Sequence, residues 1–306
     1  MAARPTAQTR RRPRATAFNE QAFAYLLLAP AFLLALAVVG YPIVNTVVTA
    51  FSKTNAVGQL AGPAGLGNFH KIFTDPIFLQ ALWRTALWTL WVVGLTTVIS
   101  MVLALILYED LRGRRVFQLI LLIPWATSVT MTTVAWMWTI NGQVGLISNT
   151  LQVWGWIPEP LGFLARGPSA LVVAIAIGIV VSIPFTTSVL VSGLHSIPDE
   201  ILEAGVLDGA QGWARFRYLI MPMIGPFLTI TLVINLINVF NSFPIIWTLT
   251  QGGPAHGTEV VVTYLYKTAF RFNEFGQAAA MSLITFIILL VLSIAFSIQT
   301  MRTRLS

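Results

Sequence analysis

Amide and hydroxyl side chains recur in an apolar stretch of the C-terminal half, NLINVFNSFPIIWTLTQGGP (235–254). Asn235, Asn238 and Ser242 are spaced i, i+3, i+7, so a helix would place them on one stripe. Asn241 lies beside that stripe. An amide left unpaired in hydrocarbon costs several kcal/mol, so these side chains need protein partners or a polar cavity. Their chemistry is hydrogen bonding, either to another helix or to a hydroxyl-bearing molecule.

Both interpretations of the stripe remain open at this point. If these side chains join helices, as interhelical glue, each hydrogen bond would contribute roughly 0.6–2 kcal/mol to helix association. As the lining of a cavity, the amides would work with Phe240, Phe243 and Trp247, because a sugar offers hydroxyls to amides and C–H faces to rings. Pro244 breaks a helix at this point and frees backbone groups that need a polar neighbour. These two features favour the cavity.

A second stretch, HSIPDEILEAGVLDGAQGWARFRYLIMP (195–222), is rich in charged and polar residues and lies between two apolar segments. Ser196 and Asp199 have the spacing of a capping box and predict a helix start. Gly209 predicts a left-handed helix end. A second short helix is predicted over residues spaced i, i+3, i+6, namely Trp213, Phe216 and Leu219. A helix–Gly–helix segment that projects from a membrane is typical of a docking site for another protein.

The same stretch resembles the EAA loop of permease subunits in ABC importers. The matching residues are Glu203, Ala204, Asp208, Gly209, Ala210 and Pro222. The sequence departs from the family at Gly205, where Ala is usual, and at Leu219 and Met221, which replace Ile and Leu. The resemblance implies that this coupling loop (195–222), Gly205 included, inserts into a groove on a cytoplasmic ATPase.

The TLTQGGP segment resembles a segment of the maltose-type permeases, the subunit class that holds the sugar in the membrane. GLGNFHKIFTDPIF (65–78) likewise resembles an external segment of sugar permeases. Carried over residue by residue, the resemblance implies these substrate-binding residues: Asn238, Asn241, Ser242, Trp247, Thr250 and Gln251. Related glycerol-phosphate permeases share the motif, so glycerol 3-phosphate or a glycerophosphodiester is the alternative substrate. An anion would favour Arg or Lys in the pathway, and this stretch has neither.

Composition identifies the elements that must position these residues. The chain has 306 residues, 56% hydrophobic and 9% charged, which is typical of an all-α integral membrane protein. Charged residues are absent from six runs long enough to span a bilayer: 21–52, 85–108, 116–158, 167–198, 218–258 and 275–301. We therefore expect six transmembrane helices, with Pro30 and Pro42 kinking the first, and Pro124 and Pro184 interrupting the third and fourth.

Six spans place both termini on one side of the membrane. The Arg-rich tail (1–20), the 109–115 turn, the coupling loop and the C-terminal end carry most of the 18 Lys and Arg residues. The positive-inside rule therefore predicts that both termini and the coupling loop are cytoplasmic. Residues 21–306 are expected to form one transmembrane domain in a bacterial plasma membrane.

Several function classes are excluded. No Walker-type phosphate loop is present, so ATP and Mg would be bound by a partner ATPase and not by this chain. We expect no catalytic residue, no metal site and no nucleic-acid partner, because the chain has no cysteine, its three histidines are scattered and its basic residues lie at membrane boundaries. No ionisable residue lies well inside a span, which disfavours a proton-coupled carrier. A self-sufficient secondary carrier or channel remains the rival.

The resemblance also implies the partners. They are a second permease subunit in a heterodimer, two ATPase subunits and an extracytoplasmic solute-binding protein, with membrane lipid around the spans.

Overall fold

The computed structural model describes residues 15–109, 112–159 and 161–305. Contacts divide the chain into two units, residues 1–48 and 49–306, which are described separately. Most of the predicted Arg-rich tail, residues 1–14, lies outside the described residues. Residues 15–20 already belong to α1 (Ala15–Ala35).

The first predicted span is a continuous helical segment, Ala22–Ala50. α1 runs through Pro30 and is followed by a π-helical turn, η1 (Leu36–Gly40), and then by α2 (Tyr41–Ala50). The N–H of Tyr41 donates to the carbonyl of Leu36, one residue further back than in an α-helix. This shift in register comes directly before Pro42, which has no N–H to donate.

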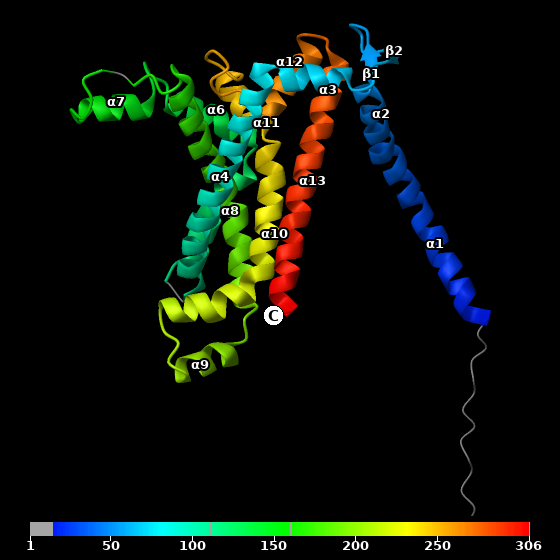
Figure 1. Cartoon of the computed structure of the whole chain (residues 1–306). Helices are drawn as coiled ribbons and strands as arrows, with labels where there is room; N and C mark the ends of the chain where they lie inside the picture. The colour runs from blue at the N-terminus through cyan, green and yellow to red at the C-terminus, as the bar shows by residue number, and fades with distance from the viewer. Residues whose placement is uncertain (1–14, 110–111, 160, 306) are drawn as a thin grey trace, which may run out of the picture. The chain divides into compact units, whose positions relative to one another are not determined.

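The second unit is a helical bundle that carries a small antiparallel sheet at one end (Figure 1). Its elements, in order, are β1 (Ser52–Thr54), β2 (Leu60–Pro63), α3 (Gly67–Thr74), α4 (Pro76–Tyr108), α5 (Arg114–Ala126), α6 (Val129–Thr139), α7 (Leu146–Val153), α8 (Gly167–His195), α9 (Asp199–Leu207), the π-helical η2 (Arg215–Ile220), α10 (Met221–Phe240), α11 (Phe243–Thr250), α12 (Val261–Phe270) and α13 (Phe275–Leu305).

The expected spans are present. Among the described residues, five helical segments are long and apolar enough to cross a membrane: Ala22–Ala50, Pro76–Tyr108, Gly167–His195, Trp213–Thr250 and Phe275–Ile298. α5 and α6 meet at a bend of 96° and pass the same test together, so the count reaches six when this bent pair is taken as one span. The break falls at residues 127–128, beyond Pro124, which lies inside α5.

α4 begins earlier than the sequence predicted, at Pro76 and not at Thr85. The Asp75 carboxylate accepts a hydrogen bond of 2.9 Å from the Ile77 N–H, and Pro76 occupies the first helical turn. Arg84 ended the uncharged run on which the prediction was based, although a charged residue near a span end does not end a helix. The segment expected to be a loop therefore holds the β1–β2 hairpin, α3 and the first turns of α4.

The prediction that Pro184 interrupts the fourth span is wrong, because α8 continues through it to His195. The Pro184 carbonyl accepts from the Ser188 hydroxyl at 2.8 Å. Serine side chains and neighbouring helices satisfy the backbone groups that a proline frees in a transmembrane helix. The predicted loops 141–167 and 251–274 also contain short helices, α7 and α12.

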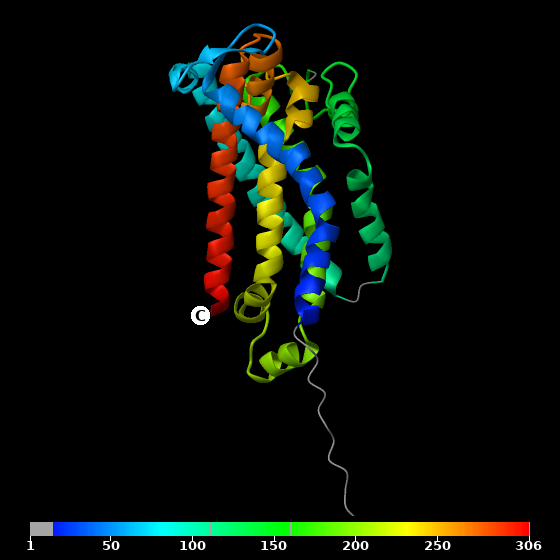
Figure 2. The ribbon, with the colours of Figure 1, turned by 90° about the vertical axis from the view of Figure 1, so that its right-hand side faces the viewer.

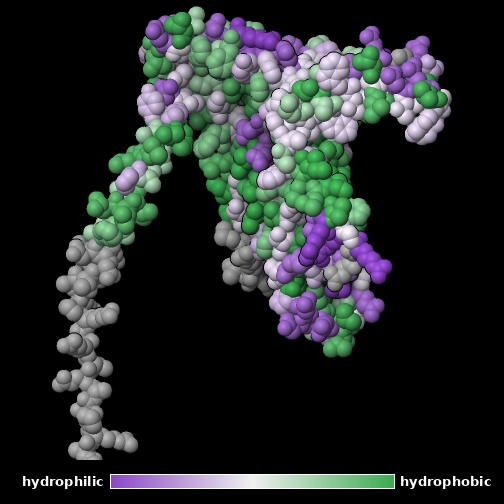
Figure 3. All heavy atoms as spheres, turned by 180° about the vertical axis from the view of Figure 1, so that it is seen from behind, coloured by the Kyte–Doolittle hydropathy of each residue, from purple (hydrophilic) through white to green (hydrophobic). Residues whose placement is uncertain are grey.

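The bundle core is built where α8 packs along α4, with α10 against both. Figure 1 and Figure 2 both show α10 and α13 running side by side. Figure 3 shows hydrophobic residues along the middle of the bundle and hydrophilic residues gathered toward its ends. α9 and the end of α13 lie at one end, and α3, α11 and α12 lie at the other (Figure 1).

Candidate functional site

The predicted helix break in the fifth span is confirmed. α10 ends at Phe240 and α11 begins at Phe243, with Pro244 in its first turn. Between them, the Phe243 N–H donates to the Asn241 carbonyl at 2.8 Å, a tight connection that no continuous helix makes. Pro244 has no N–H to donate, and in the first turn of α11 no such donor is needed.

A cavity of about 460 Å³ lies beside this break and is called the break cavity. Its lining comes from α4, α5, α6, α8, α10 and α11 and consists of Trp88, Trp125, Val129, Gly178, Val181, Ser182, Phe185, Ile234, Asn235, Asn238, Val239, Asn241, Ser242, Pro244 and Ile245. The lining combines amides and hydroxyls with aromatic rings and contains no charged residue. This surface suits a neutral molecule that offers both hydroxyl groups and apolar faces.

The amide stripe divides between the two interpretations left open by the sequence. Asn235 is 3% exposed, and its side-chain N–H donates to the Thr186 hydroxyl of α8 at 2.8 Å. This amide is interhelical glue, although it also borders the cavity. Asn238 and Asn241 are exposed and Ser242 is partly exposed, all three at the cavity. The Asn241 amide donates to the Ile237 carbonyl of its own helix at 3.0 Å, so it joins no second helix.

Sequence reasoning missed the residues that other helices contribute to this cavity. Trp88 of α4, Trp125 of α5 and Phe185 of α8 supply its rings. Aromatic residues are common throughout membrane helices, so their types carried no signal. Trp88 is the most constrained of the three: it is 1% exposed, and its indole Nε1–H donates to the Val239 carbonyl of α10 at 2.8 Å.

Trp247, Thr250 and Gln251 do not line the break cavity. Trp247 stacks on Phe243 with ring centroids 5.0 Å apart, and the Arg271 guanidinium lies 5.2 Å from its ring. The Gln251 side-chain oxygen accepts from Arg271 at 3.0 Å. Through Arg271, Trp247 and Gln251 fasten the end of α11 to the end of α12.

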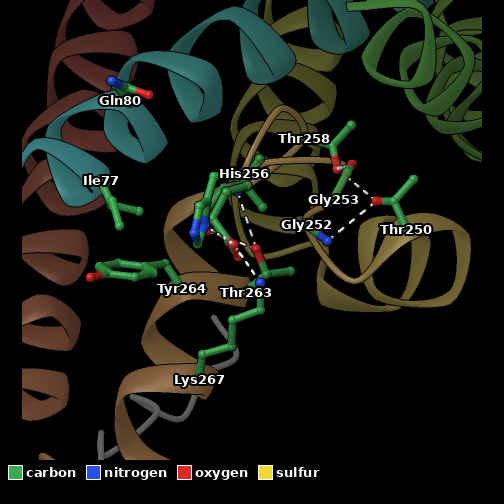
Figure 4. Close-up of polar contacts among 12 residues, drawn as sticks. Ile77, Gln80, Thr250, Gly252, Gly253, His256, Thr258, Thr263, Tyr264 and Lys267 are labelled. Atoms are coloured by element: carbon green, nitrogen blue, oxygen red, sulfur yellow. Dashed lines mark hydrogen bonds and ion pairs between the residues drawn. The ribbon is translucent and has the colours of Figure 1, made fainter. Parts of the chain in front are cut away.

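Thr250 belongs to a folded turn, residues 250–259, that connects α11 to α12 (Figure 4). The hydroxyls of Thr250 and Thr258 lie 2.6 Å apart, and Thr258 also donates to the Gly253 carbonyl at 2.7 Å. Gly252 lies directly against the carboxylate of Glu259: a Cβ there would be 2.5 Å from Oε1. Gly252 also has a φ of +85°, so both space and backbone require glycine at this position.

Glu259 is fully buried, and two basic side chains lie at its Oε2. Lys267 of α12 donates to it, and His256 Nδ1 lies 3.0 Å away. α12 is in turn fastened to α4, because the Tyr264 hydroxyl donates to the Asp75 carboxylate and the Val261 N–H donates to the Thr85 hydroxyl at 2.9 Å. Burial, and then the hydrogen bond to Asp75, raises the pKa of Tyr264.

The coupling loop is helical in both predicted stretches, although only the first forms a separate helix. α9 (Asp199–Leu207) ends before Gly209, whose φ of +82° confirms the predicted left-handed position. The predicted cap is wrong: the Ser196 hydroxyl donates to the Gly193 carbonyl at 2.7 Å and so ends α8, while Pro198 precedes α9 without a side-chain cap. The second helix is not separate either, because it begins at Trp213 and continues through η2 into α10, with Pro222 in the first turn.

α9 is held against η2 by one side of its surface and exposes the other. A Cβ at Gly205 would lie 2.2 Å from Cδ1 of Leu219, so the glycine makes room for this leucine. Two of the three positions at which the loop departs from the family pattern, Gly205 and Leu219, are therefore in contact. Glu203, Ala204 and Asp208 are exposed, and Leu207 is 89% exposed. An acidic and apolar surface is thus available at this end of the molecule.

Comparisons with known proteins match most of the chain to membrane components of transport systems. Residues 96–304 match the family described as binding-protein-dependent transport system inner membrane component. A probable ABC transporter permease protein of Brucella suis is 44% identical, and the match covers 89% of this chain and 94% of that protein. The trehalose/maltose transport system permease protein MalF of Thermococcus litoralis is 28% identical, over 91% and 94%. The sn-glycerol-3-phosphate transport system permease protein UgpA of Agrobacterium fabrum is 29% identical, over 94% and 97%.

A solved structure has the same fold. It is the bacterial alginate ABC transporter in complex with an alginate pentasaccharide-bound periplasmic protein. One of its chains aligns with a TM-score of 0.80 and 19% identity, covering 94% of this chain and 96% of that one.

Proposed function

Because the chain belongs to the family of binding-protein-dependent transport system inner membrane components, we propose that it forms half of the translocation path for a neutral, sugar-like solute in an ATP-binding-cassette importer. It is a multi-pass transport subunit of the inner membrane. The solute class is a mono- or oligosaccharide or a polyol. A relative named for trehalose and maltose supports this class.

The observation that carries the proposal is the composition of the break cavity. Asn238, Asn241 and Ser242 offer hydrogen bonds at the point where the helix is interrupted. Trp125, which is exposed, and Phe185, which is partly exposed, contribute aromatic faces to the same lining. A sugar ring needs both kinds of surface, and each of its hydroxyls can donate and accept.

The coupling loop is the proposed contact with the ATPase. Its contact residues are Glu203, Ala204, Gly205, Asp208, Gly209, Ala210 and Pro222. The exposed Glu203 would meet a basic residue of the ATPase, and Gly205 would act from inside by seating α9 on η2. Two ATPase subunits would supply the ATP and Mg sites, a second permease the other half of the path, and a solute-binding protein the substrate. Closure of the ATPases would move α9 and, through η2 and α10, the helix break at the far end of α10.

Two alternative functions are disfavoured, one by the lining of the break cavity and the other by the family. Glycerol 3-phosphate is supported by the name of one relative, but the break cavity presents no Lys or Arg to a phosphate. A self-sufficient secondary carrier is disfavoured by membership of a binding-protein-dependent family.

The test is reconstitution of the chain with its partner permease, ATPase and binding protein in lipid vesicles. ATP-dependent uptake would be compared for maltose, trehalose, a polyol such as sorbitol, and sn-glycerol 3-phosphate. We expect uptake of a neutral solute that requires ATP and the binding protein. Uptake of glycerol 3-phosphate alone would overturn the solute class, and uptake by this chain without the ATPase would overturn the importer.

A further inference from the structure

The side chain of Trp88, in α4, is hydrogen-bonded to a backbone carbonyl of α10 next to the helix break. Its Nε1–H donates to the Val239 carbonyl at 2.8 Å. That carbonyl also accepts from the Ser242 N–H at 3.1 Å. Val239 stands just before the interruption, where the regular pattern of helix hydrogen bonds ends.

The indole is held in place from its other side by α8. A Cβ at Gly178 would lie 2.8 Å from Cη2 of Trp88 and 3.0 Å from Cγ2 of Val92. Real Cβ atoms do not approach carbon so closely, so a side chain at this position would displace the ring. Gly178 has no unusual backbone conformation, and its role here is to leave space for Trp88.

We propose that Trp88 is a positioning residue for the break cavity: its indole, wedged between Gly178 and Val239, fixes the backbone that presents Asn241 and Ser242. The proposal rests on the proposed function, in which these two side chains contact the solute. The reason is geometric. Asn241, the C-cap of α10, and Ser242 come two and three residues after Val239, and the Ser242 N–H donates to the same carbonyl, so holding this carbonyl sets where their side chains point.

The first test needs no substrate. In the assembled complex, Trp88→Phe keeps an aromatic ring and removes the N–H donor. We expect faster hydrogen–deuterium exchange in residues 239–247 than in the wild-type protein, with exchange in α13 unchanged. Trp91→Phe is the matched control, because Trp91 lies one turn further along α4 and is 51% exposed. Exchange at 239–247 that is unchanged in Trp88→Phe would overturn the proposal.

The second test separates positioning from packing. For the solute that the wild-type complex takes up from the panel above, Trp88→Phe should raise the half-saturating concentration roughly three- to tenfold, the range of one neutral hydrogen bond, with a smaller fall in maximal uptake rate. A merely structural defect would instead lower the maximal rate through loss of assembled complex. Trp91→Phe should match the wild type.

A double-mutant cycle tests the wedge itself. Gly178→Ala should raise the half-saturating concentration in the wild-type background by pushing the indole from Val239. In the Trp88→Phe background it should add little, because phenylalanine has no atom equivalent to Cη2; any crowding of Val92 is present in both backgrounds and cancels. Additive effects would overturn the proposed role of Gly178 in holding the indole against Val239.

A comparison with Asn241→Leu distinguishes failure of this inference from failure of the proposed function. If Trp88→Phe has no effect on uptake while Asn241→Leu does, the positioning role fails and the proposed function stands. If neither variant has an effect, the break cavity is not the substrate site.

Discussion

The Asn235 amide donates to the Thr186 hydroxyl at 2.8 Å, between α10 and α8, and both residues are buried. One turn later on the same stripe, Asn238 is exposed at the break cavity, and so is Asn241 beside the stripe. The stripe therefore changes role along its length. Its first amide joins two helices, and its later members present polar groups to the space beside the helix break.

That division predicts that Asn235→Leu lowers the stability of the complex, whereas Asn241→Leu weakens its affinity for the solute. Asn235→Leu removes an interhelical hydrogen bond and leaves the buried Thr186 hydroxyl without its donor, a loss of about 1–3 kcal/mol. We expect a lower thermal midpoint of the purified complex with little change in the solute concentration for half-maximal uptake. A shift in that concentration, with an unchanged midpoint, would place Asn235 in the substrate site.

The contact between Gly205 and Leu219 predicts that two departures from the family compensate each other. Gly205→Ala places a methyl group 2.2 Å from Leu219 Cδ1, and overpacking of this kind typically costs about 1–3 kcal/mol. We expect less ATPase to co-purify with the membrane subunits. Leu219→Ile, the residue usual in the family, should restore part of the yield when combined with Gly205→Ala. A double variant as impaired as Gly205→Ala alone would contradict the compensation.

The left-handed turn at Gly209 predicts a backbone effect. A Cβ at this position would meet no atom within 4 Å, so any penalty comes from the φ of +82° alone. For a non-glycine residue that penalty is about 1–3 kcal/mol. Gly209→Val should reduce co-purification of the ATPase and leave membrane insertion intact. Gly225→Ala is the control, because Gly225 lies in α10 with equally open space and an ordinary φ; equal yields from the two variants would count against the turn.

These results show which features could be predicted from the sequence. The spans, the break before Pro244 and the turn at Gly209 depend on apolar length, on a missing N–H and on a positive φ, all of which are local properties. The capping role of Ser196 failed because the same hydroxyl could serve either neighbouring helix, and it ends α8.

Features that depend on distant residues could not be predicted. Trp88 and Val239 are 151 positions apart, and nothing in either residue type indicates their hydrogen bond. Trp247, Thr250 and Gln251, which the resemblance implies as substrate-binding residues, lie outside the lining of the break cavity and make contacts where α11 meets the turn before α12 and the end of α12. A sequence pattern indicated where polar groups gather but not which of them share a cavity.

The buried pair of Glu259 and Lys267 predicts that breaking it costs more than removing it. Lys267→Met leaves a buried carboxylate with only His256 beside it, and losing one partner of a buried pair costs about 3–5 kcal/mol. The double variant Glu259→Gln/Lys267→Met removes both charges and should recover much of that loss. The thermal midpoint of the complex measures the loss in Lys267→Met and its recovery in the double variant. A double variant less stable than Lys267→Met would contradict this prediction.

Glu203 is proposed to meet a basic residue of the ATPase, which predicts uncoupling. Glu203→Lys reverses an exposed charge on α9 without touching its packing. We expect ATP hydrolysis that no longer responds to the loaded binding protein, together with reduced uptake. Glu200→Lys, also exposed on α9, controls for the change in net charge, and normal coupling in Glu203→Lys would remove Glu203 from the contact.

The central claim is that the break cavity holds the solute, and Asn241→Leu tests it most directly. Asn241 bonds only within its own helix among the described residues, so its loss should leave assembly intact. Loss of one substrate hydrogen bond in a shielded site should weaken affinity by up to about a hundredfold. The measurement is solute-stimulated ATPase activity and uptake of the reconstituted Asn241→Leu complex, scored separately from its yield. Normal yield with a raised half-saturating concentration is the predicted result, and normal yield with wild-type stimulation and uptake would contradict it.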